Sequence, residues 1–119
     1  MKIRGIEVNF DFFDADDIEK FENEARKVAE VSKEKVVNMS PADVIRRECT
    51  IIENFFDNVF GEGISEKMFK GKKNLEEHMK AFEDIVKAKL DKQKELQNTF
   101  NRYQPNREQR RYNQFKGCK

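Results

Sequence analysis

The residues with the most obvious chemical potential lie in a glycine- and lysine-rich stretch, FGEGISEKMFKGKKN, at residues 60–74. A phosphate-binding P-loop has the pattern G-x-x-x-x-G-K-[ST] between a strand and a helix, because its backbone N–H groups must surround the phosphates. Here Glu66 stands where the first glycine is needed, and Lys73 stands where the hydroxyl residue is needed. The residues before the stretch also have a helical pattern rather than a strand pattern. We therefore predict that its glycines end helices and make turns around a short helix at residues 64–70.

Side chains that could bind a metal or carry out catalysis lack the spacing that such chemistry needs. The acidic run at residues 14–17 is not followed by the central glycine and terminal glutamate of an EF-hand loop. His78 has no second ligand on its helical face, and Cys49 and Cys118 are distant in sequence, so a zinc site is not expected. No nucleophile and base signature is present. We expect no metal, no cofactor and no catalytic residue, a protein that is not an enzyme, and a partly buried His78.

The C-terminal end has the composition of a binding tail. Residues 102–119 contain six basic residues and one acidic residue, a net charge of +5, so the preceding part of the chain carries −4. The candidate partner-binding residues are Arg102, Tyr103, Arg107, Arg110 and Arg111. Arginines interleaved with aromatic rings can contact phosphates and stack on bases, and they can equally dock onto an acidic protein surface. A plain solvated tail is the third reading, and among the functional ones protein docking is favoured because no second basic stripe is present to hold a duplex.

The elements that position these residues are predicted to be mainly helical. Apolar and polar residues alternate over residues 3–12, which predicts a short strand or hairpin. Helical spacing of apolar residues then predicts longer helices at about residues 15–37, 41–60 and 75–100.

The start of each longer helix has a capping side chain followed three residues later by an acid. These caps are Asp14, Ser40 and Asn74. We predict one mainly α (α+β) domain over residues 1–101, a small helical bundle with an N-terminal strand or hairpin, followed by a basic, flexible tail over residues 102–119.

Two helices carry apolar residues that their own bundle is not expected to cover. The helix at residues 41–60 is apolar around about half its circumference, with Val44, Ile51 and Phe55 extending its main stripe. The second half of the last helix keeps only Leu96 and Phe100 on its stripe, so this end could project past the core. These five residues are predicted to contact a partner or a second copy of the chain.

No stretch of the sequence suggests a membrane or an export route. No apolar run approaches the length of about 20 residues that spans a bilayer, and MKIRGIEVNF lacks the apolar region of a secretory signal. We expect a cytoplasmic protein with no membrane partner.

Three blocks of the sequence resemble a family of small proteins encoded by tailed bacteriophages and prophages. The blocks are VNFDFFDADDIEKFE at residues 8–22, FFDNVFGEGISEKMFKGKKNLEE at residues 55–77 and YQPNREQRR at residues 103–111. Members of that family look like tail assembly chaperones of long-tailed phages.

The resemblance implies binding rather than enzymatic activity. It suggests a homo-oligomeric protein, located in the bacterial host cell, that coats the tape measure protein, keeps it soluble and recruits tail tube subunits. The alternative is a nucleic-acid-binding phage accessory protein that acts through the basic C-terminal tail.

Overall fold

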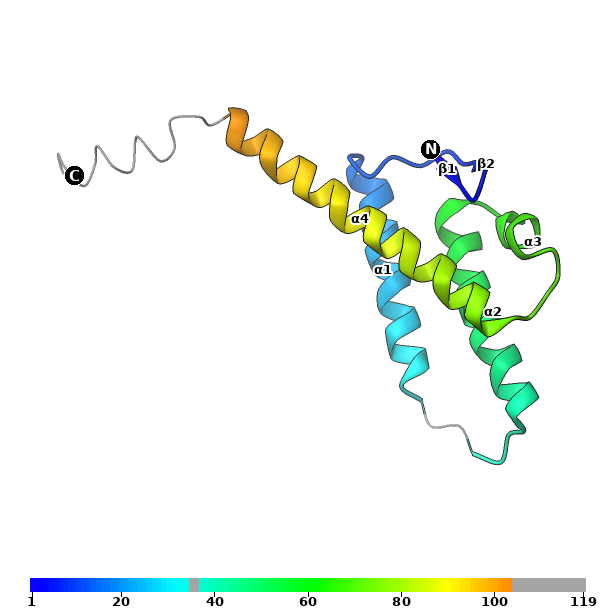
Figure 1. Ribbon diagram of the computed structural model, residues 1–119. Coiled ribbons are helices and arrows are strands. Elements are labelled where there is room, and N and C mark those ends of the chain that lie inside the picture. Colours follow the sequence, from blue (N-terminus) through cyan, green and yellow to red (C-terminus); the bar gives the residue numbers. More distant parts are fainter. Residues whose placement is uncertain (35–36, 104–119) are drawn as a thin grey trace, which may run out of the picture.

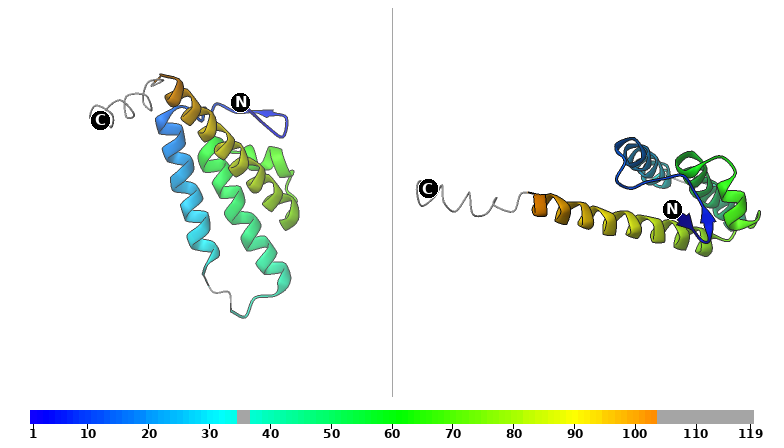
Figure 2. Two further views of the ribbon diagram at one scale, coloured as in Figure 1. Left: turned by 60° about the vertical axis from the view of Figure 1, so that its left-hand side comes forward. Right: turned by 90° about the horizontal axis from the view of Figure 1, so that it is seen from above.

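The computed structural model describes residues 1–34 and 37–103, and in that part of the chain it contains one two-stranded hairpin and four helices. Two helices, α1 (Ala15–Ser32) and α2 (Pro41–Phe60), lie side by side and form one layer (Figure 1). The longest helix, α4 (Leu75–Tyr103), crosses one face of this layer and continues beyond it (Figure 2). The predicted fold class, a mainly helical bundle with an N-terminal hairpin, is confirmed.

The N-terminal hairpin is formed by β1 (Lys2–Ile3) and β2 (Ile6–Glu7), with Ile3 paired with Ile6. Its two turn residues, Arg4 and Gly5, have φ values of 50° and 83°, the left-handed conformation that a tight two-residue hairpin needs. Beyond Glu7 the chain leaves the hairpin, but the predicted alternation continues, because Val8, Phe10 and Phe12 are buried. The strand is therefore shorter than the apolar pattern that predicted it.

The start of α1 agrees with the prediction, and its end does not. Asp14 caps the first turn by accepting a hydrogen bond from the N–H of Asp17 at 3.0 Å. The helix ends at Ser32 rather than residue 37. Arg47 of α2 donates to the carbonyl of Val31 at 3.0 Å, and the N–H of Glu34 bonds back to the same carbonyl, so the last turn is tightened.

Helix α2 has the bounds that its sequence predicts, and its cap is also as predicted. Ser40 accepts from the N–H of Asp43 at 3.1 Å, and Pro41 occupies the first helical position. Gly61, with a φ of 129°, ends the helix. The predicted role of this glycine in helix termination is confirmed.

The short helix α3 (Ile64–Phe69) begins at Gly63, which has no side chain to cap it. Asp57 of α2 supplies the cap instead, because its carboxylate accepts from both the N–H and the hydroxyl of Ser65, each at 2.9 Å. Phe69 is buried at the end of α3. The glycine-rich stretch is therefore a connection between helices, as predicted.

The core between the two layers consists largely of phenylalanine rings. Most neighbouring rings meet edge to face, with centroids 4.8–6.4 Å apart, an arrangement that suits the ring quadrupole. The rings in this cluster are those of Phe10, Phe12, Phe21, Phe55, Phe56, Phe60, Phe69 and Phe82.

Helix α4 passes through residue 101, the predicted domain boundary, and continues to Tyr103. Asn74 caps it as predicted, by accepting from the N–H of Glu77 at 3.0 Å. Among the described helices, none combines the length and the apolar character that crossing a membrane requires. The predicted tail from residue 104 onward lies outside the described residues.

Candidate functional site

An open groove between α1 and α2 is the candidate functional site. Its volume is about 250 Å³. The apolar part of its lining comes from Val28 and Val31 of α1 and from Ile51 and Phe55 of α2, and the polar part from Glu24, Lys27, Asn54 and Asn58. A concave apolar floor with a polar rim is the usual form of a site that receives a helix or a compact ligand.

The groove lies on the face of the α1/α2 layer opposite to α4. Glu22 of α1 forms an ion pair with Lys89 of α4 at 3.5 Å, so this side of α1 faces α4. Glu24, two residues further on, lies about 200° away around a helix of 3.6 residues per turn, and it lines the groove. The views in Figure 2 show that α4 covers only one side of the layer.

The rim of the groove is held by hydrogen bonds across the two helices. Glu24 accepts from the amide of Asn58 at 3.1 Å and forms an ion pair with Lys27 at 3.0 Å. Burial acts to raise the pKa of Glu24, but the hydrogen bonds from Lys27 and Asn58 outweigh it and hold the pKa below its ordinary value. The rim therefore keeps an ionised carboxylate at neutral pH.

The predicted apolar contact residues of α2 lie at different depths. Ile51 is partly exposed in the groove, and Val44 is partly exposed two turns earlier, outside the groove lining. Phe55 is 1% exposed, with its ring 5.2 Å from that of Phe21 and 5.0 Å from that of Phe82. Phe55 forms the floor of the groove and packs in the core, and its contact with a partner stays a prediction.

The far end of α4 is a second candidate contact surface. Beyond its crossing of the layer, α4 extends past the start of α1 (Figure 1). Phe100 is 51% exposed on this end, and Leu96, one turn earlier, is partly exposed. Met79 and Leu90 of the same helix are 48% and 53% exposed.

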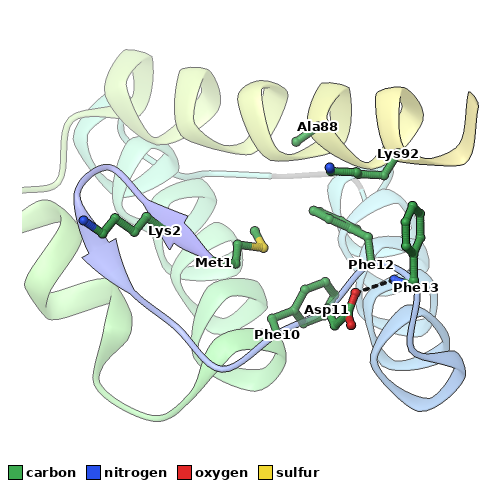
Figure 3. Close-up of a pocket in the computed structure, with 8 residues that line it drawn as sticks. All are labelled: Met1, Lys2, Phe10, Asp11, Phe12, Phe13, Ala88 and Lys92. Atoms are coloured by element: carbon green, nitrogen blue, oxygen red, sulfur yellow. Dashed lines mark hydrogen bonds between the residues drawn. The ribbon is translucent and has the colours of Figure 1, made fainter. Parts of the chain in front are cut away.

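A further open pocket lies where the N-terminal segment meets α4 (Figure 3). Its volume is about 380 Å³, and its lining includes Phe10, Phe12 and Phe13 beside Ala88 of α4. The carboxylate of Asp11 accepts from the N–H of Phe13 at 2.8 Å and so serves the local turn. No group of three or more metal-ligating side chains occurs within residues 1–34 and 37–103.

A buried polar network joins α2 to the start of α4. His78 is 0% exposed rather than partly buried, and its ring stacks on Phe69 with centroids 3.7 Å apart. Glu53 is its partner, and Glu53 also pairs with Lys73 at 2.5 Å. Sequence reasoning missed this network, although Glu53 interrupts the apolar stripe of α2 one turn after Cys49 and a carboxylate there needs a partner.

The predicted binding residues of the basic end are only partly described. Arg102 is exposed on the last turn of α4. The backbone of Tyr103 is helical, and Arg107, Arg110 and Arg111 lie outside the described residues. Among the described residues, the predicted contact residues that stay accessible are Val44 and Ile51 on α2 and Leu96, Phe100 and Arg102 on α4.

Comparison with known proteins places the chain in a family. No curated protein and no solved structure matches it significantly. The family match extends over residues 4–114 and so includes the second strand of the hairpin, the groove and all of α4. On that match, the chain belongs to DUF6673, a family of unknown function.

Proposed function

We propose that the protein is a phage tail assembly chaperone-like binding protein, which holds a helical part of the tape measure protein and recruits tail tube subunits during tail morphogenesis. The observation that carries this proposal is the groove on the uncovered face of the α1/α2 layer, with Val28, Val31 and Ile51 accessible above Phe55. The sequence resemblance to tail assembly chaperones agrees with it.

The client that suits this groove is an amphipathic helix. Such a helix presents apolar side chains three and four residues apart, and these enter a groove between two helices while its polar face stays in water. The rim carries the Glu24–Lys27 ion pair and the amides of Asn54 and Asn58, so it suits the polar residues that flank the apolar stripe of the client. Tape measure proteins are expected to be long and helical, so many segments could meet this requirement in turn.

The expected affinity is modest. One buried leucine-sized anchor contributes about 1.5–3 kcal/mol, and a groove of this size accommodates few anchors. Association also costs several kcal/mol of lost translational and rotational freedom. Binding at each site is therefore expected to be weak, about millimolar, and weak binding suits a chaperone that must release its client when the tail tube assembles.

Co-expression with the tape measure protein of the same genome tests the proposal. The wild-type chain should keep the client soluble and be recovered with it. Ile51→Asp places a charge in the groove and should abolish recovery, whereas Ile45→Asp, at a 37% exposed position of the same helix outside the groove lining, should not. An insoluble client with wild-type protein, or equal effects of both variants, would contradict a chaperone acting through the groove.

The second candidate function is nucleic-acid binding through the basic end. Its support is the charge division of the sequence, in which residues 102–119 carry +5. Binding of this kind should fall steeply with salt and should disappear when residues 102–119 are deleted. If the full chain retains no nucleic acid at low salt, this candidate is excluded.

A further inference from the structure

We propose that the groove of one copy of the chain receives the far end of α4, residues 93–103, from a second copy. The two surfaces are exposed apolar features that lie on different parts of the molecule. Their pairing would join copies head to tail.

The groove cannot be filled by the α4 of its own chain. Helix α4 is one continuous helix of 29 residues, about 43 Å long. It crosses the opposite face of the α1/α2 layer, where Lys89 pairs with Glu22, and then continues away from the layer (Figure 2). The two-helix layer therefore separates the far end of α4 from its own groove, and only another copy can present this end to it.

The apolar parts of the two surfaces are complementary. Phe100 and Leu96 lie four residues apart on α4, the spacing at which helical side chains form one ridge. The groove offers Val28 and Val31 on one wall and Ile51 on the other, above the floor that Phe55 forms. A ridge of two large side chains entering a groove between helices follows the ordinary rules of helix packing.

The charges of the two surfaces are also complementary. Helix α1, which forms one wall, has six acidic and three basic residues, a net charge of −3. The α4 end, residues 93–103, contains two basic residues and one acidic residue, a net charge of +1. Opposite charge on the two sides favours this pairing over groove against groove or α4 end against α4 end, where like charges would meet.

Because the two surfaces differ, the contact is heterologous and each bound copy presents a further groove and a further α4 end. Such contacts produce rings when the rotation closes and open chains when it does not. One consequence rests on the proposed function: a helical client and the neighbouring α4 end would compete for the same groove.

Sedimentation of the full chain without any client tests the proposal. The mass of the wild type should rise with concentration and fall again at high salt. Ile51→Asp removes the groove and Phe100→Asp removes the ridge, so each alone should weaken self-association by at least about tenfold. An equimolar mixture of these two variants should form one-to-one dimers and nothing larger, because it contains one intact groove and one intact α4 end in each pair.

Matched controls separate the contact from general effects of a new charge. Ile45→Asp and Leu90→Asp introduce the same side chain at exposed apolar positions of α2 and α4 outside the two surfaces, and both should associate as the wild type does. If Ile51→Asp unfolds, Asn54→Trp fills the mouth of the groove from an exposed position and should have the same effect.

Each other outcome overturns the proposal. If the wild type stays monomeric at all concentrations, the proposal is wrong. If the wild type associates but the mixture of the two variants stays monomeric, the head-to-tail arrangement is wrong. Self-association that persists in Ile51→Asp indicates contact between α4 ends, and persistence in Phe100→Asp indicates contact between grooves. Since no client is present, these results are independent of whether the tape measure protein is bound.

Discussion

The Nε2 atom of His78 lies 2.8 Å from Oε2 of Glu53, and its Nδ1 atom lies 2.6 Å from the carbonyl oxygen of Asn74. A carbonyl oxygen can only accept a hydrogen bond, and the same is true of an ionised carboxylate. The two ring nitrogens of His78 therefore face two acceptors, and a nitrogen that carries a proton donates to the oxygen beside it. This pair connects the middle of α2 to the first turn of α4 beneath the ring of Phe69.

The Glu53 carboxylate should make part of the stability depend on pH. Burial acts to raise the pKa of Glu53, but hydrogen bonds from Lys73 and His78 outweigh it and hold the pKa below the ordinary value of 4.5. A carboxyl with a depressed pKa contributes stability above its unfolded pKa and loses that contribution as the pH falls through its folded pKa. Glu53→Gln should lower the free energy of unfolding by about 1–3 kcal/mol at neutral pH, and by progressively less as the pH falls below about 4.5.

Urea unfolding at a series of pH values measures this difference. Glu83→Gln, at an exposed position of α4, is the matched control and should change the free energy of unfolding little at any pH. A deficit of Glu53→Gln that is the same at neutral and acidic pH would show that the charge of Glu53 is not what stabilises the network.

Phe55 should behave as a core residue. Because the side chain is 1% exposed, Phe55→Ala should lower the free energy of unfolding by about 3–5 kcal/mol, whereas Phe13→Ala, at a 51% exposed ring, should lower it by less than about 1 kcal/mol. Chemical denaturation of the two variants gives both values. A Phe55→Ala variant as stable as the wild type, but unable to bind its partner, would return Phe55 to the contact surface that the sequence suggested.

The Ser40 cap should contribute measurably to α2. Loss of its hydroxyl leaves the N–H of Asp43 without its 3.1 Å partner, so Ser40→Ala should lower the free energy of unfolding by about 1 kcal/mol. Thr50→Ala, at an exposed position within the same helix, should not be destabilising because alanine has the higher helix propensity. Thermal unfolding of both variants checks the cap, and equal losses would argue against it.

Cys49 should be unreactive in the folded protein. Burial raises the pKa of its thiol, and the nearby Glu53 carboxylate raises it further, so little of the thiolate nucleophile forms at neutral pH. In a Cys118→Ser variant, a thiol reagent should label Cys49 slowly under native conditions and rapidly in urea. Fast labelling of the folded variant would mean that α2 opens at Cys49 without global unfolding.

Local interactions explain which parts of the fold the sequence could predict. The caps at Asp14, Ser40 and Asn74 depend on residues three positions apart, and all three are present. The end of α1 depends instead on Arg47, sixteen residues away, and nothing near Ser32 signals that contact. Such a tertiary contact overrides a helical pattern that continues in the sequence.

Part of the candidate site could also be predicted, because the apolar face of a helix can be read from its sequence. A broad apolar face on α2 indicated surplus contact surface, and Ile51 does line a groove. Periodicity could not tell whether Ile51 or Phe55 would be covered, because this depends on where α1 and α4 pack. The partner of His78 was missed because Glu53 lies 25 residues away in sequence.

The hydrogen bonds from Ser65 to Asp57 make α3 depend on α2. A six-residue helix is far too short to persist by itself in water, and α3 receives its cap from a side chain in the last turn of α2. Fraying of the last turn of α2 should therefore release α3, and Phe69, which α3 carries, would then lose its place against the His78 ring. The contact between Glu53 and His78 joins α2 to α4 directly and does not pass through α3.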